Sequence, residues 1–119
     1  MLDLDGLKYI NDNFGHKEGD FAIRAAAEAL KYSCPDNAVC TRLGGDEMLA
    51  VFLECDYDIR ERLNSRLDDI NSTSGKPYKV LGSMGILELP LGDHPNMEDL
   101  IRRTDKLMYE EKRRRKSHE

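Results

Sequence analysis

The chain has 119 residues, of which 39% are hydrophobic and 34% are charged, and its net charge is −5. This length suits one domain with its own core, and this composition excludes a disordered chain. No apolar run approaches the roughly 20 residues that a membrane span requires, and no basic-then-apolar leader begins the sequence, so we expect a cytoplasmic protein. The three cysteines lack the spacing of a zinc or redox motif and are expected to be reduced, structural thiols.

The first predicted element is a short strand over residues 1–5, where apolar and acidic residues alternate. Because successive side chains of a strand point to opposite faces, this alternation places Asp3 and Asp5 on the same side. Gly6 ends the strand. The pattern of residues 7–11 is typical of one or two helical turns.

A loop with two closely spaced glycines is expected over residues 13–20. Asp20 is a candidate cap of the helix that follows, although Glu18 could equally lie within the first turn of that helix. The helix itself is predicted over residues 21–32, since its alanine run is a strong helix-forming signal. Residues 35–37, Pro-Asp-Asn, break it.

A β-hairpin is predicted around residues 39–53, with Gly44 and Gly45 at its tip. The glycines permit positive φ and allow a ligand to approach the backbone closely. Asp46 and Glu47 follow at once, so the tip suits a site for a cation and a phosphate. Taken alone, the same residues also suit a solvated turn, since Gly and Asp favour turns for conformational reasons.

The remaining elements are a helix, a strand and a last helix. Apolar residues at helical spacing predict an amphipathic helix over residues 59–70, preceded by capping residues at 56–58. Residues 78–89 favour a strand whose two interior glycines indicate a bulge or a close backbone approach. Residues 97–116 predict the last helix. The order indicates an α/β domain with an antiparallel sheet backed by helices on one face or both.

Acidic residues from distant parts of the chain predict a metal site. If the first strand and the hairpin are neighbours, Asp3 and Asp46 can converge on one magnesium ion, which prefers oxygen ligands and is commonly held by one or two carboxylates plus substrate phosphates. Such a set fits phosphoryl or nucleotidyl transfer. Lys112 and Lys116 lie four residues apart on one helical face and could contact the same phosphates, or form a solvated stripe.

Three blocks of sequence resemble the GGDEF domain, the diguanylate cyclase catalytic domain of bacteria. They lie at residues 3–20, which contain Asp-Leu-Asp-Gly-Leu-Lys-Tyr-Ile-Asn-Asp, at residues 42–47, Arg-Leu-Gly-Gly-Asp-Glu, and at residues 103–112. The resemblance covers nearly all of residues 1–119. It implies a cyclase-like palm fold with a ferredoxin-like core, in which the first strand and the segment before it are shortened here.

The resemblance implies that two GTP molecules are joined into cyclic di-GMP in a facing homodimer, with Mg²⁺ or Mn²⁺ as cofactor and a sensory domain upstream in the native protein. Metal ligation falls to Asp3, Asp46 and the Leu4 carbonyl, and proton removal to Asp46 or Glu47. The implied substrate-binding residues are Asn11 and Asp20 at the guanine edge, Lys8, Lys112 and Lys116 at the phosphates, and Gly44 and Gly45 at the tip.

Several positions depart from the family pattern. Met48 and Leu7 stand where the family has Phe, and the Arg-x-x-Asp of the family's inhibitory site falls on Pro35 to Ala38. A degenerate domain that binds GTP or a protein partner without turnover is therefore the alternative function. The basic run at residues 112–116 also suits a nucleic-acid tail or a helix end, and the acidic remainder of the chain argues against nucleic acid.

Overall fold

The computed structural model describes residues 1–90 and 92–117, and the side chains of residues 116 and 117 lie outside this description. The elements follow the predicted order. They are β1 (Leu2–Asp5), α1 (Leu7–Phe14), α2 (His16–Ser33), β2 (Val39–Gly44), β3 (Glu47–Val51), α3 (Ile59–Thr73), β4 (Leu81–Met84) and α4 (Met97–Ser117). Within these described residues, no helix combines the length and the apolar character that crossing a membrane requires.

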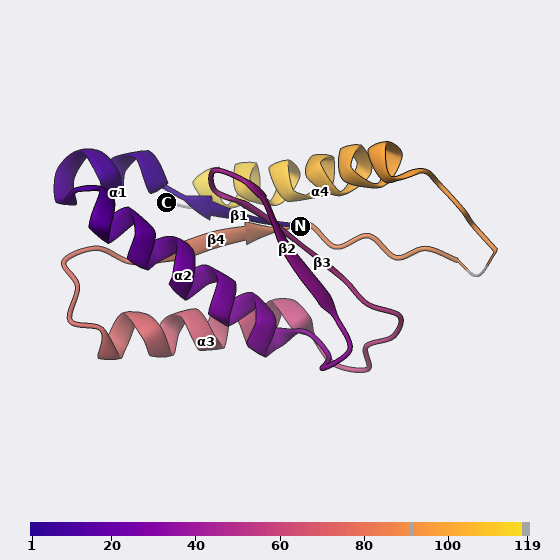
Figure 1. Cartoon of the computed structure of the whole chain (residues 1–119), viewed down its shortest axis with the longest axis horizontal. Helices are drawn as coiled ribbons and strands as arrows, with labels where there is room; N and C mark the ends of the chain where they lie inside the picture. The colour runs from indigo at the N-terminus through magenta and orange to yellow at the C-terminus, as the bar shows by residue number, and fades with distance from the viewer. Residues whose placement is uncertain (91, 118–119) are drawn as a thin grey trace.

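The strands, which are labelled in Figure 1, form one antiparallel sheet in the order β2-β3-β1-β4. The short strand β1 therefore lies inside the sheet, where Leu2 pairs with Met48 of β3 on one side and with Met84 of β4 on the other. This four-stranded sheet with flanking helices confirms the predicted fold class. Because β1 is paired with a neighbour on each edge, its position in the sheet is fixed despite its short length.

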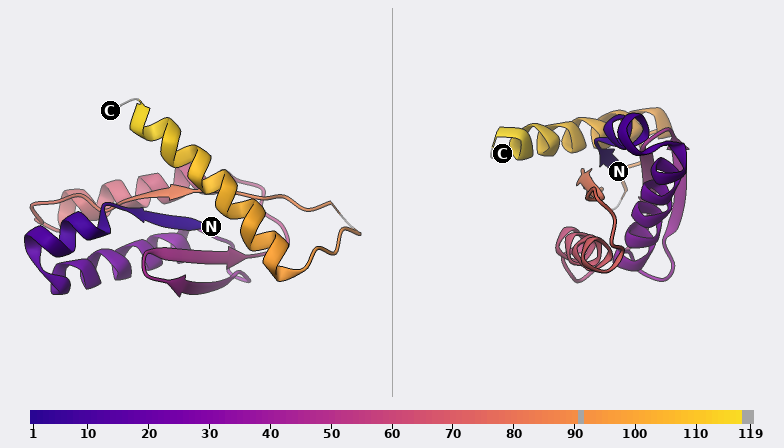
Figure 2. Two further views of the ribbon diagram at one scale, coloured as in Figure 1. Left: turned by 90° about the horizontal axis from the view of Figure 1, so that it is seen from above. Right: turned by 90° about the vertical axis from the view of Figure 1, so that its left-hand side faces the viewer.

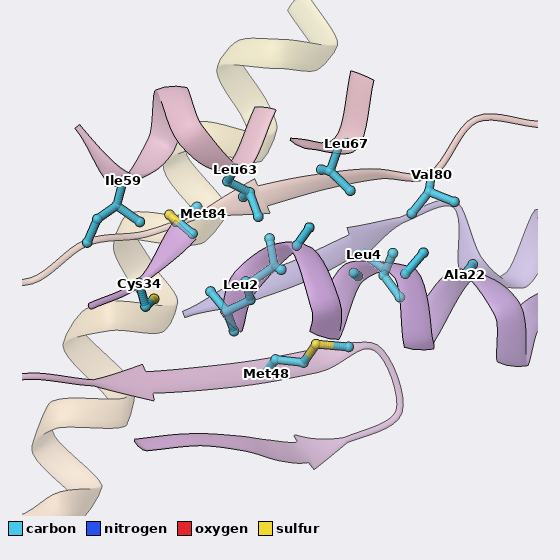
Figure 3. Close-up of a cluster of buried hydrophobic side chains, with 14 of the residues drawn as sticks. Leu2, Leu4, Ala22, Cys34, Met48, Ile59, Leu63, Leu67, Val80 and Met84 are labelled. Carbon is cyan, nitrogen blue, oxygen red and sulfur yellow. The ribbon is translucent and has the colours of Figure 1, made fainter. Parts of the chain in front are cut away.

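The alternation of β1 separates a core face from a polar face. Leu2 and Leu4 are buried in a cluster with residues of α2 and α3, among them Leu63 (Figure 3). Asp3 and Asp5 point the other way and contact side chains of α4. The sheet therefore lies between α2 and α3 on one face and α4 on the other, as the side views show (Figure 2).

The prediction of a loop over residues 13–20 is wrong, because these residues belong to α1 and α2 except for Gly15. Gly15, with φ of 95°, reverses the chain, and its carbonyl accepts hydrogen bonds from the backbone N–H of Glu18 and of Gly19, so α2 begins at His16. Asp20 consequently lies within the helix and does not cap it. Asn11 lies inside α1 rather than at its end. For α3, by contrast, Asp58 is the cap, and its carboxylate accepts from the backbone N–H of Glu61 at 3.1 Å.

The strand predicted over residues 78–89 is shorter than expected, because the described ladder of β4 ends at Met84. Of the two glycines in the predicted strand, Gly85 marks a close backbone approach, as the sequence indicates, whereas a Cβ on Gly82 would first meet the Leu2 side chain. A Cβ on Gly85 would lie 2.6 Å from the Thr104 carbonyl oxygen and closer still to the backbone nitrogen of Met108. The backbone of α4 therefore packs directly against the end of β4.

Strand β3 continues past the start of β1 to Val51, and on the other side the residue after β4 pairs with the start of the chain. Met1 and Gly85 exchange backbone hydrogen bonds of 2.8 Å in both directions. Beyond this pair, residues 49–52 and 85–87 line an apolar cavity of about 110 Å³, together with residues of α4. Val51 and Ile86 line this cavity and are 54% and 37% exposed.

Candidate active site

The end of β1 and the tip of the β2–β3 hairpin form the centre of the candidate site (Figure 1). The Leu4 N–H donates to the Asp46 carbonyl oxygen at 2.9 Å, which fixes the tip beside β1. Asp3 lies directly opposite Glu47 in the ladder. Residues opposite one another in an antiparallel pair present their side chains on the same face, so Glu47 shares the face of Asp3.

The hairpin tip has the backbone that the sequence predicts. Gly45 has φ of 49°, in the left-handed region that glycine adopts without strain. Gly44 and Gly45 are both exposed, so a ligand can reach them. The Arg42 guanidinium donates two hydrogen bonds, of 3.1 and 2.7 Å, to the Gly45 carbonyl oxygen. These bonds hold the turn in one conformation.

Asp3 is a buried carboxylate, only 7% exposed. Burial raises its pKa from 3.8 to about 6, the hydrogen bond from Lys112 opposes that rise, and the negative charge of Asp46 adds to it. The Lys112 ammonium donates to Asp3 Oδ2 at 2.6 Å. The other oxygen, Asp3 Oδ1, is buried and has no hydrogen-bond partner. A buried oxygen of this kind is a ready ligand for a cation.

Lys112 joins α4 to both acidic residues of β1. Its nitrogen lies 2.6 Å from Asp3 and 3.8 Å from Asp5. Burial works against the ammonium, but the hydrogen bond and the charge of Asp3 outweigh burial and raise the pKa of Lys112. The predicted phosphate ligand therefore lies at the candidate metal site, where its charge balances the carboxylates.

Two residues that sequence reasoning missed complete this network. The Ser83 hydroxyl donates to Asp5 Oδ1 at 3.0 Å, and the Arg115 guanidinium pairs with Asp5 Oδ2 at 3.2 Å and donates to the Gly82 carbonyl oxygen. A signal for Arg115 was present, since it lies three residues after Lys112 and thus on the same helical face. Ser83 gives no such signal.

The donor set fits magnesium. Within residues 1–90 and 92–117, no three His, Cys, Asp or Glu side chains gather into a complete metal cage. Magnesium does not need one, because it usually keeps several waters and takes one or two carboxylates with substrate phosphates. The unpartnered Asp3 Oδ1 and the neighbouring Asp46 carboxylate match that requirement.

The residues predicted to read a base lie on α1 and α2, beyond the end of β1. The half-buried Asn11 places its side-chain amide against the backbone of Gly19, and the exposed Asp20 is the next residue of α2. Lys8 lies on α1 with its side chain exposed. The structure thus brings the Asn11 side chain to Gly19, the residue that precedes Asp20 in α2. Lys116 belongs to α4, but its side chain lies outside the described residues.

Comparison with known proteins adds independent information. Residues 1–118 match the family model described as "Diguanylate cyclase, GGDEF domain". The chain is 35% identical over 98% of its length to the probable diguanylate cyclase DgcJ of Escherichia coli, and 33% identical over 94% to the diguanylate cyclase VdcA of Vibrio cholerae. It spans 23% and 35% of the lengths of these relatives.

Solved structures share the fold. The active GGEEF domain of a diguanylate cyclase from Vibrio cholerae is 28% identical with a TM-score of 0.75, and the match covers 95% of this chain and 74% of that one. The diguanylate cyclase SiaD from Pseudomonas aeruginosa, in complex with its activator SiaC, is 26% identical with a TM-score of 0.77. That match covers 94% of this chain and 44% of SiaD.

Proposed function

This chain belongs to the GGDEF family of diguanylate cyclases, and on that basis we propose that it joins two GTP molecules into cyclic di-GMP with release of pyrophosphate. The observation that carries the proposal is the buried oxygen of Asp3, which has no hydrogen-bond partner, beside Asp46 and within the reach of Lys112. These three groups supply the two carboxylates and the cation that a metal-bound triphosphate needs.

Each part of the site has a defined task in this proposal. Asp3, Asp46 and the Leu4 carbonyl hold Mg²⁺ or Mn²⁺, which when bound polarises the phosphoryl oxygens and offsets their charge. Lys112, which pairs with Asp3 in this structure, would also contact the phosphates if that carboxylate were bound to the metal. Lys8 and Lys116 add positive charge at the phosphates. Gly44 and Gly45 leave room for the triphosphate.

Either Asp46 or Glu47 accepts the proton of the attacking 3′-hydroxyl in this proposal. Both Asp46 and Glu47 lie close enough to Asp3 to serve, because Asp46 interacts with the Asp3 carboxylate and Glu47 lies opposite it in the ladder. Each subunit holds one GTP in this proposal, and the product contains two guanosine units. Two copies of the site must therefore face one another during the reaction.

Mass spectrometry tests the proposal. The purified chain is incubated with GTP and Mg²⁺, with parallel samples that contain ATP or excess EDTA. We expect cyclic di-GMP only in the sample with GTP and metal. GTP binding without product would support the degenerate alternative, in which the domain binds nucleotide and does not react it. Absence of GTP binding would contradict the assigned site.

Guanine preference should depend on Asp20. A carboxylate accepts hydrogen bonds from the guanine edge, whereas the adenine edge offers a different donor pattern. We expect Asp20→Asn to lower the affinity for GTP about tenfold and to leave the affinity for ATP unchanged, as loss of one charged hydrogen bond implies. Competition titrations measure both affinities, with the exposed Asp12→Asn as the matched control. Equal affinities of the parent for GTP and ATP would contradict this role.

Product inhibition at the family's second site should be absent. At the matching positions the backbone forms a turn in which the Ala38 N–H donates to the Pro35 carbonyl oxygen at 2.9 Å. Neither side chain carries a charge. Losing two charge-assisted contacts, at roughly 1.5–3 kcal/mol each, weakens binding by a few orders of magnitude. Calorimetry should show no micromolar binding of cyclic di-GMP here, and tight binding that Asp36→Ala removes would contradict this expectation.

A further inference from the structure

Gly19 is an unusual residue for the interior of a helix. It is buried in the first turns of α2, where glycine costs about 1 kcal/mol relative to alanine. A Cβ on this residue would overlap the side-chain oxygen of Asn11 and lie 2.8 Å from its Cγ. The space that any other residue would fill is therefore occupied by the Asn11 amide.

The backbone between the two residues leads them to this contact. The Gly15 N–H donates to the Asn11 carbonyl oxygen at 3.0 Å, and the Gly19 N–H donates to the Gly15 carbonyl oxygen at 3.2 Å. The positive φ of Gly15 turns the chain between these two bonds. As a result α1 folds back on α2, and Asn11 reaches the α2 backbone one residue before Asp20.

The start of α2 is also fixed from its other side. The Glu18 carboxylate accepts a hydrogen bond from the Tyr78 hydroxyl at 2.7 Å and pairs with the Lys76 ammonium at 2.9 Å. These contacts tie the first turns of α2 to the segment that leads into β4. A methyl group at residue 19 cannot easily be accommodated by movement of α2, so the Asn11 side chain must move instead.

We propose that Gly19 is a specificity-positioning residue, which sets the place of the Asn11 amide relative to the Asp20 carboxylate so that the two read one guanine edge together. This inference rests on the proposed function of the site as a GTP site. Gly19 touches no substrate. It acts through Asn11, because only a residue without Cβ lets the amide lie against the backbone next to Asp20.

A double-mutant cycle tests the inference by binding rather than turnover. The α,β-methylene analogues of GTP and ATP are titrated, since their α–β bridge cannot be cleaved. We expect Gly19→Ala to lower the affinity for the GTP analogue about tenfold, as loss of one hydrogen bond implies, with the ATP analogue unchanged. Asn11→Ala should show the same loss, and the double variant should lose no more than Asn11→Ala.

The control Ala27→Gly changes helix propensity on the exposed side of α2 without approaching Asn11, and should keep the parent's selectivity. If Gly19→Ala fails to fold, the double variant should regain the melting temperature of Asn11→Ala, because the clash partner is gone. An unfolded double variant, additive losses, or unchanged selectivity in Gly19→Ala would each overturn the inference. If the parent itself shows no preference for the GTP analogue, the proposed function is contradicted as well. If the parent shows that preference and only the variants behave unexpectedly, the role of Gly19 alone is contradicted.

Discussion

Asp46→Asn should lower the formation of cyclic di-GMP by about a thousandfold or more, which corresponds to about 4 kcal/mol of lost transition-state stabilisation. The substitution keeps the volume of the side chain and removes the negative charge that the proposed metal site requires. Discontinuous sampling of the reaction by mass spectrometry measures the rate. Calorimetry with the α,β-methylene analogue of GTP should show, in parallel, that the dependence of binding on Mg²⁺ is lost.

Two controls separate this effect from a loss of folding. Asp68→Asn makes the same chemical change at an exposed position of α3 and should leave the rate unaffected. The melting temperature of metal-free Asp46→Asn should not fall, because the variant removes the repulsion between Asp46 and the buried Asp3. A variant that keeps a rate within tenfold of the parent would show that Asp46 does not hold the metal.

Gly85→Ala should have the largest effect on stability. The added methyl group would meet backbone atoms of Thr104 and Met108, and no side-chain rotation can relieve that contact. Helix α4 must move away from β4, at a cost of about 3 kcal/mol, which lowers the melting temperature by about 10 °C. Because α4 also carries Lys112, the Gly85→Ala molecules that remain folded should bind nucleotide more weakly than the parent. Thermal melts and binding titrations check both effects.

Gly82→Ala, within β4 and three residues before Gly85, is the matched comparison. There the added methyl group would lie 2.7 Å from Leu2 Cδ1, the end of a flexible side chain, so a rotation of Leu2 can relieve the contact. We expect a loss of about 1 kcal/mol for this variant. If both variants melt at the same temperature, the contact between α4 and β4 yields easily, and the backbone of α4 does not exclude a Cβ at residue 85.

The sequence by itself determined the order of the elements, the antiparallel sheet and the family. These features depend on local patterns, such as the alternation in residues 1–5 and the glycine pair at the hairpin tip, which the structure reproduces. The placement of Asp3 and Asp5 on one face was likewise predictable, because strand geometry fixes it. The start of α2 could not be predicted in this way, since a single glycine at residue 15 can end a helix, begin one, or lie in a loop.

Only the tertiary structure decided which basic side chains neutralise the carboxylates of the site. The partner of Lys112 is Asp3, 109 residues away, and no local pattern relates the two. The same holds for Arg115 with Asp5, which meet because α4 crosses the polar face of the sheet. The need for glycine at residue 19 also follows from packing, since it reflects where the Asn11 side chain lies. Long-range contacts of this kind depend on the whole arrangement of sheet and helices, so they could be seen only once the chain was folded.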